Sequence, residues 1–234
     1  MEGLELKWKF HERDTVIVDN PDNLVGAGLA DPLITPSNLI IPLNGVARGD
    51  TGDSRDGIQV TNQCIELRYT VEWPGAALGI QFADYFSPVS VSLWWDNAPN
   101  KEEQEPHTAP KFHPEDYILK STAISQRNGC GWFLDPCYEK RFEILYREEI
   151  DCLSPAIGWY TATNGTSAGV TETRCVIVDL GGKVSLWDDS GNETLNTLIT
   201  GALHLVVWKG GGIPAFNDIP VHFHWTSLFR YFSE

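Results

Sequence analysis

Residues 65–73 alternate apolar and polar side chains without a break. The odd positions hold Ile65, Leu67, Tyr69, Val71 and Trp73. Successive side chains of a β-strand point to opposite faces, so this pattern predicts a strand with one buried face. Just upstream, Ile58 and Val60 have the opposite parity. The change of parity predicts a β-bulge or a change of partner strand at residues 61–63.

Similar alternation marks further candidate strands. The longer ones cover residues 89–95, 142–146, 203–207 and 219–231, and the shorter ones 8–10, 16–18 and 175–180. Clusters of Gly, Pro, Asn and Asp, among them residues 129–136, separate these segments and predict loops. The one helical signal is HPEDYILK, residues 113–120, where Pro114 suits the first position of a helix.

Composition and connectivity narrow the fold class. The 234 residues include 21 Gly, 14 Pro and 9 Trp but 1 Met, a mixture rich in strand and turn formers. Eight or nine strands without strand–helix alternation or an internal repeat describe a β-sandwich or barrel. We expect an all-β protein, a single eight-stranded jelly-roll sandwich with long inter-strand loops, because long loops suit strands that cross between two facing sheets. We expect one domain over residues 1–234, in which residues 1–38 are an N-terminal strand and loop segment without a basic arm.

Acidic residues dominate the charge of the chain. There are 32 acidic and 17 basic side chains, and the net charge is −15. Such a chain repels polyanions unless its basic residues gather on one surface, and no run of five basic residues occurs. Without a signal-peptide core or about 18 consecutive apolar residues, we expect a soluble protein with no membrane partner. The five cysteines form no C-x-x-C pair, which predicts buried free thiols.

Three aspartates lie close together in GDTGDSRDGIQV, residues 49–60. An EF-hand loop needs carboxylates at positions 1, 3 and 5, whereas Asp50, Asp53 and Asp56 occupy positions 1, 4 and 7. A looser calcium site at a subunit contact is the alternative. We expect a turn that ends at Gly57 and opens the next strand, with the aspartates facing solvent or a neighbouring subunit.

Two histidines in VHFHW form a second candidate site. His222 and His224 are two residues apart on a strand and share one face, as in the metal-binding H-x-H of cupins. The inward parity belongs to the apolar residues Val221, Phe223 and Trp225, which leaves both histidines on the polar face. We therefore expect no metal site here, with a cupin-like metalloprotein as the alternative.

Other signatures of catalysis are missing from the sequence. No nucleophile elbow, P-loop, H-E-x-x-H or dinucleotide-binding glycine motif occurs. Trp73, Trp95 and Trp225 keep the apolar parity of their strands, which predicts core positions rather than a sugar-binding surface. We expect no enzyme and no catalytic, cofactor-binding or metal-binding residues.

Four segments occur in a characteristic order. Residues 40–71 place Arg55 and Gly57 in a turn before the motif I-x-L-R at 65–68, and VSVSLWWDNAPN ends a strand at Asp96. RFEILY follows at 141–146, and GALHLVV at 201–207 precedes the final RYFSE. Together these segments resemble the capsid proteins of small circular single-stranded DNA viruses, the CRESS DNA viruses.

The resemblance implies a viral structural protein. Many copies would self-assemble with icosahedral symmetry into a small non-enveloped capsid around a single-stranded DNA genome. The protein would be made in the host cytoplasm, assemble there or in the nucleus, and reside in the virion. Its partners would be copies of itself and, weakly, the viral DNA. A carbohydrate-binding or other ligand-binding β-sandwich is the alternative of a different class.

The N-terminus departs from the pattern of this family in a way that bears on genome binding. Members of this family usually begin with an arginine-rich arm, whereas this chain begins MEGLELKWKFHERD. Each phosphate neutralised by Lys or Arg releases a counterion and adds affinity. A net charge of −15 without such an arm therefore predicts empty or weakly loaded particles.

Overall fold

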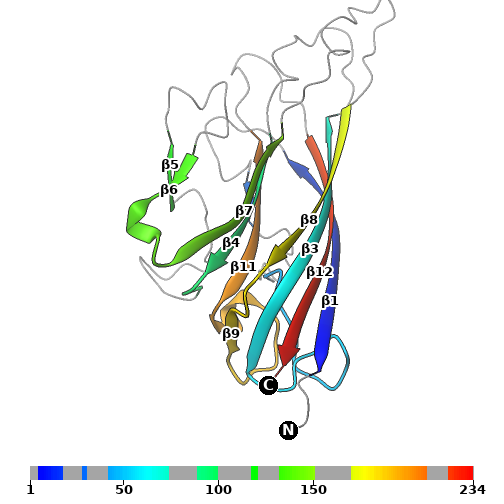
Figure 1. Ribbon diagram of the computed structural model, residues 1–234, viewed down its shortest axis with the longest axis vertical. Coiled ribbons are helices and arrows are strands. Elements are labelled where there is room, and N and C mark those ends of the chain that lie inside the picture. The colour runs from blue at the N-terminus through cyan, green and yellow to red at the C-terminus, as the bar shows by residue number, and fades with distance from the viewer. Residues whose placement is uncertain are drawn as a thin grey trace, which may run out of the picture.

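The computed structural model describes residues 5–17, 28–30, 42–73, 89–99, 117–120, 132–150, 170–209 and 221–233. Their strands pair only in antiparallel fashion, and all but two of them form two facing sheets (Figure 1). The helices in this part of the chain are the short 3-10 helices η3 (Pro136–Tyr138) and η4 (Leu195–Thr197). Neither has the length or the apolar character to cross a membrane. The expectation of an all-β sandwich is confirmed.

The first sheet has the strand order β1-β12-β3-β9-β10, and β8 also pairs with β3. Its strands are β1 (Leu6–Ile17), β3 (Gln59–Trp73), β8 (Val170–Asp179), β9 (Val184–Trp187), β10 (Leu198–Thr200) and β12 (Val221–Ser233). The order leaves β1 at one edge of the sheet, with β12 as its partner along its whole length.

The second sheet has the order β2-β11-β4-β7. Its strands are β2 (Gly28–Ala30), β4 (Val89–Asp96), β7 (Phe142–Ile150) and β11 (Ala202–Lys209). A separate two-stranded ribbon pairs β5 (Ile118–Lys120) with β6 (Trp132–Leu134), and we call it the β5–β6 ribbon. The described residues thus hold more strands than the eight or nine expected, because three-residue strands are too short to show alternation.

Strand β3 changes partners where its alternation breaks. Cys64 pairs with Asp179 of β8, whereas Thr61 pairs with Val184 of β9. Its register with β12 shifts at the same place, so that Gln63 has no counterpart there. Both forms of the predicted irregularity are therefore present, a bulge and a change of partner.

The facing sides of the sheets bury one continuous apolar cluster. It contains the odd residues of 65–73 and the tryptophans predicted for the core, Trp73, Trp95 and Trp225. The alternating residues of β11 and β12 are buried as predicted, and Ile219 lies outside the described residues. Burial of this apolar surface supplies the main driving force for folding.

Strand β4 is buried on both faces, which its alternation did not predict. Ser90, Ser92 and Trp94, on the outer side, are as inaccessible as the core residues between them. The ring of Phe142 lies 5.7 Å from that of Trp94 and 4.5 Å from that of Tyr117, which immediately precedes the β5–β6 ribbon. Tyr117 and the β5–β6 ribbon therefore lie outside this end of the second sheet (Figure 1).

Three expectations about local structure are wrong. Residues 118–120 of the expected helix form strand β5, and the expected loop 129–136 contains strand β6. Tertiary packing explains both, because Ile118 and Leu134 are paired across the ribbon and pack against the core cluster. Cys64, Cys137 and Cys175 are free as expected, yet Cys137 and Cys175 are exposed. The remaining two cysteines lie outside the described residues.

Candidate functional site

The turn between residues 43 and 58 is organised by Arg55. Its side chain is fully buried, and its Nε donates a hydrogen bond to the Val46 carbonyl oxygen at 3.0 Å, while Nη1 donates to the carbonyl of Gly57. The guanidinium carbon lies 5.3 Å from the ring centre of Trp187. Burial, followed by the positive charge of Arg48, lowers the pKa of Arg55. Arg55 therefore holds the loop to the sandwich.

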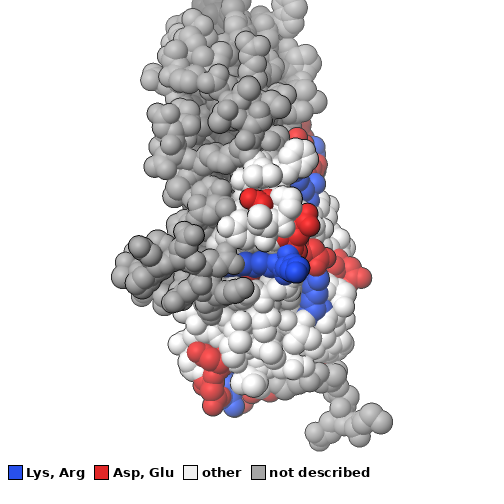
Figure 2. Space-filling view, turned by 90° about the vertical axis from the view of Figure 1, so that its left-hand side faces the viewer, with Lys and Arg blue, Asp and Glu red and all other residues white. Residues whose placement is uncertain are grey.

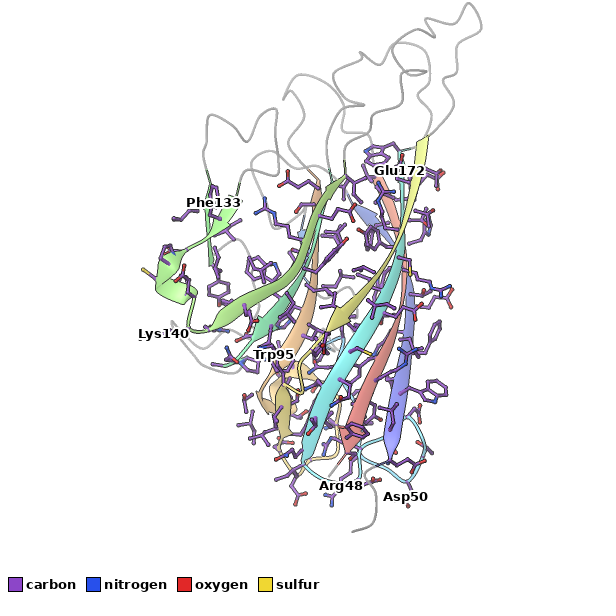
Figure 3. All side chains as sticks on the ribbon, in the orientation of Figure 1. Arg48, Asp50, Trp95, Phe133, Lys140 and Glu172 are labelled. Atoms are coloured by element: carbon purple, nitrogen blue, oxygen red, sulfur yellow. The ribbon has the colours of Figure 1, made fainter. Side chains whose placement is uncertain are left out.

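The three aspartates of this turn point outward (Figure 3 labels Asp50). Asp53 accepts a hydrogen bond from Thr51 Oγ1 at 2.6 Å, which lowers the pKa of its carboxyl. Asp56 forms an ion pair with Lys7 at 2.7 Å. Across the described residues, no three His, Cys, Asp or Glu side chains gather into a group that could hold a metal ion. The prediction of a turn with exposed aspartates is confirmed.

His222 and His224 lie on the outer face of β12, as predicted. Their rings are stacked with centres 6.3 Å apart, and His224 Nε2 lies 3.7 Å from a carboxylate oxygen of Glu72. The neighbouring residues Val221 and Phe223 point into the core. A cupin-type site needs histidines that point into the barrel, so this pair does not form one.

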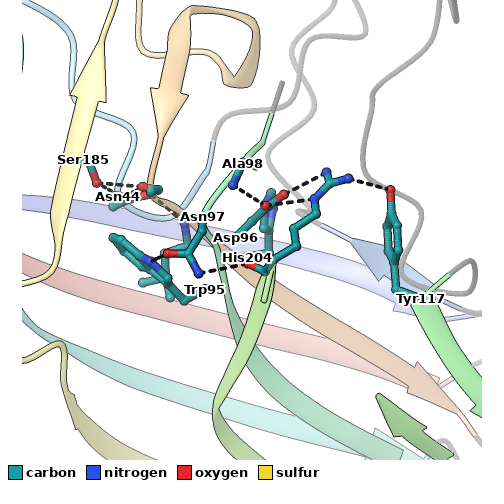
Figure 4. A network of polar contacts seen from close by, with 11 residues as sticks. Asn44, Trp95, Asp96, Asn97, Ala98, Tyr117, Ser185 and His204 are labelled. Atoms are coloured by element: carbon teal, nitrogen blue, oxygen red, sulfur yellow. Dashed lines mark hydrogen bonds and ion pairs between the residues drawn. The ribbon is translucent and has the colours of Figure 1, made fainter. Parts of the chain in front are cut away.

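A buried polar network joins the second sheet to the layer outside it (Figure 4). Arg141 donates two hydrogen bonds of 3.1 Å to the two carboxylate oxygens of Asp96, and its Nη1 donates to the Tyr117 hydroxyl at 3.3 Å. His204 Nε2 lies 3.9 Å from Asp96. Asp96 and Arg141 come from separate sequence motifs, and their pairing was not predicted. A bidentate pair of this kind fixes geometry strongly.

A second buried network ties the 43–58 turn to both sheets (Figure 4). The Asn44 amide donates to Ser185 Oγ and to the Gly201 carbonyl oxygen, each at 2.8 Å. The Asn44 side-chain oxygen accepts from the Leu203 backbone N–H, also at 2.8 Å. Asn62 donates to the same Ser185 hydroxyl. The Asn44 amide and the Ser185 hydroxyl are hydrogen-bonded within this network, whereas the buried side-chain oxygen of Asn62 has no hydrogen-bond partner among the described residues.

A third polar cluster bridges the two sheets. Tyr69 of β3 donates to a Glu148 oxygen at 2.6 Å, Tyr146 of β7 donates to the same oxygen, and Arg174 of β8 donates to the other at 3.0 Å. Burial and the hydrogen bond to Glu148 raise the pKa of Tyr146 to about 12. Burial alone would raise the pKa of Glu148, but its hydrogen bonds outweigh burial and lower it. The Glu148 carboxylate is thus held in place by three hydrogen-bond donors.

Strand β1 has an inverted polarity. Lys7, Lys9 and His11 lie on the side that faces the core, where Lys9 pairs with Glu193 at 3.2 Å. Over residues 6–12, the part of β1 whose side chains are described, the apolar residues Leu6, Trp8 and Phe10 point outward, and Trp8 is 54% exposed. A strand at this position was predicted, but periodicity alone would assign its apolar side to the core. We call the outward residues Leu6, Trp8 and Phe10 the β1 patch.

Neither the known protein-family models nor the curated proteins give a match to this chain. Within each of the three polar clusters described above, the side chains bind mainly to one another. Among the described residues, several large apolar side chains are exposed, including Trp8 and Phe10 on the edge strand β1 and Leu119 and Phe133 on the β5–β6 ribbon.

Proposed function

We propose that this chain is the structural subunit of a small non-enveloped icosahedral capsid that encloses a single-stranded DNA genome, and that its sandwich is a jelly roll. The strand order is the observation that carries the proposal. Strands β1, β2, β3 and β4 alternate between the first and second sheets, and β7, β8, β11 and β12 alternate in the reverse sense. Jelly rolls join eight strands across two sheets in this way, and viral capsids, lectins and cupins use them.

The polar groups favour the capsid among these three. The inward face of β12 carries no histidine, which argues against a cupin. The best-formed polar clusters link β7 to β8 and the 43–58 turn to β9 and β11, so they rigidify the sandwich. A shell subunit needs such a rigid framework, and it needs no reactive group.

The charge distribution supports weak contact with the genome. Lys7 and Lys9, the basic residues on the inward side of β1, are engaged by Asp56 and Glu193. With a net charge of −15, few cations are left to neutralise phosphates. Particles should therefore be empty or lightly loaded.

The test is the state of the purified chain in solution. Sedimentation velocity and negative-stain electron microscopy, over a range of pH, salt and divalent cation, should reveal closed particles of uniform diameter. Monomers under every condition would overturn the proposal. A lectin-like protein would also remain monomeric or form small oligomers, and binding to a glycan array would then identify it. Tightly bound, nuclease-resistant nucleic acid at moderate salt would contradict the expected weak loading.

A further inference from the structure

A second exposed apolar surface lies on the β5–β6 ribbon. Leu119 and Phe133 are cross-strand partners, and their side chains are 50% and 72% exposed. Their neighbours Ile118 and Leu134 pack inward against the core cluster. We call Leu119 and Phe133 the ribbon patch. Clustered exposed apolar residues on a folded protein mark interaction surfaces.

The β1 patch and the ribbon patch lie on opposite sides of the sandwich. Strand β1 is the edge strand of the first sheet, whereas the ribbon adjoins the second sheet through Tyr117 and Phe142. Figure 1 shows β1 and the ribbon at opposite lateral borders, and Figure 3 labels Phe133 at the ribbon's border. One molecule therefore cannot bring its own two patches together.

The charges near these patches permit close approach of another copy. Lysines commonly protect the edge strands of sheets, but in β1 both Lys7 and Lys9 turn inward to form ion pairs. Figure 2 views the side of the molecule that carries the ribbon, where the described surface is mostly uncharged and its acidic and basic side chains lie close together. Copies with a net charge of −15 repel one another least through such surfaces.

The exposed area indicates a weak contact that must be repeated. At about 200 Å² for each aromatic side chain, the exposed parts of Trp8, Phe10 and Phe133 amount to roughly 350 Å². A standard stable interface buries about 1,600 Å² in total. These residues form the apolar, aromatic centre of an interface whose isolated pair is weak and should be populated only at high protein concentration.

We propose that the β1 patch of one copy docks on the ribbon patch of the next copy. Because the two patches are different surfaces, each copy uses both at once, and the head-to-tail contact repeats until a ring closes. A contact of the β1 patch with itself would end at a two-fold dimer. This inference rests on the proposed self-assembly and names the surfaces that produce it.

Two single variants separate these arrangements. Trp8→Glu removes the β1 patch, and Phe133→Glu removes the ribbon patch. Both side chains are more than half exposed, so circular dichroism and thermal unfolding should match the wild type. Each variant alone should lose assembly and sediment as a monomer. Phe10→Glu provides an independent second variant of the β1 patch.

Mixing the two variants is the decisive measurement. Phe133→Glu retains a β1 patch and Trp8→Glu retains a ribbon patch, so the mixture should form a 1:1 complex that grows no further. Sedimentation equilibrium at the highest soluble concentration should show the shift from monomer to dimer mass. Trp8→Glu mixed with the Trp8→Glu/Phe133→Glu double variant should remain monomeric. Ile177→Glu, at another exposed apolar residue of the first sheet, should assemble normally.

The opposite results would overturn the inference. Phe133→Glu forming dimers alone would show that the β1 patch pairs with itself. A mixture that stays monomeric, single variants that assemble like the wild type, or equal loss of assembly in Ile177→Glu would each exclude the proposed pairing. If the wild type forms no particles but the mixture forms the complex, the capsid proposal fails and the contact stands.

Discussion

The two sheets differ in the solvent exposure of their outer faces. In the first sheet, β12 alternates strictly between buried and half-buried residues, so its outer face stays accessible. In the second sheet, every residue of β4 is buried, although its sequence also alternates. At one end of β4, the ring of Phe142 packs against Trp94 and against Tyr117, which precedes the β5–β6 ribbon outside the second sheet. Alternation thus predicts which face points inward, but it does not predict whether the other face meets solvent.

Replacing one tryptophan on each outer face should give the largest contrast. Trp94 is fully buried and Trp8 is 54% exposed. Trp94→Ala should lower the free energy of unfolding by about 3–5 kcal/mol because it leaves a cavity. Trp8→Ala should lower it by less than about 1 kcal/mol. Urea unfolding of monomeric protein measures both, and equal losses would show that the outer faces are equivalent.

The buried ion pair of Asp96 with Arg141 should give the next largest effect on stability. Asp96→Ala leaves the buried Arg141 guanidinium without its carboxylate and should cost about 3–4 kcal/mol. The double variant Asp96→Ala/Arg141→Met should recover part of this loss, because no buried charge remains. Asp189→Ala removes the carboxylate of an exposed ion pair with Arg48 and serves as the matched control, with no measurable change expected. If Asp96→Ala were as mild as the control, the network would not hold this layer.

A pH effect should arise from the first sheet. Burial, followed by the charge of Lys9, lowers the pKa of His11 from 6.5 to about 4. As the pH falls from 6.5, the unfolded chain binds this proton and the folded chain does not, so stability decreases until about pH 4. The loss amounts to about 3 kcal/mol. Unfolding measured against pH should show a shallower slope in His11→Gln, and an unchanged slope would exclude His11 as the cause.

The smallest effect should appear where the chain passes between the sheets. Gly201 connects β10 to β11 with a φ of +80°, and a Cβ there would lie 2.5 Å from the Val184 carbonyl oxygen. Gly201→Ala should lower stability by about 2 kcal/mol, through backbone strain and this clash. Gly181 has a φ of +60° and nothing within 4 Å of such a Cβ. Gly181→Ala should therefore cost about half as much, through backbone strain alone. Equal costs in thermal unfolding would argue against the clash.

Local patterns predicted a large part of the framework. The period of two placed the strands and inward residues of β3, β11 and β12, because a pleated strand alternates its side chains whatever surrounds it. The parity change before Ile65 predicted the bulge and the change of partner. The outward position of His222 and His224 followed from the same rule.

Sequence patterns did not predict the β5–β6 ribbon, the buried ion pair or the exposed cysteine. The three-residue strands β5 and β6 have too few residues for a period, and packing of Ile118 and Leu134 decides their conformation. The pairing of Asp96 with Arg141 joins residues distant in sequence, which no local pattern reveals. Cys175 is exposed because its position in β8 faces outward.

The amino-acid order alone determined that the chain forms strands, where most of them run, and which residues of β3 and β12 are inward, since these depend on backbone geometry and hydrophobicity within a few residues. Only the tertiary structure decided that β1 turns its apolar side outward and that β4 is covered on both sides. Those outcomes depend on partners distant in sequence, namely Asp56 and Glu193 for the lysines of β1, and Tyr117 for the outer layer. A sheet face becomes core or surface only when another part of the chain does or does not fold over it.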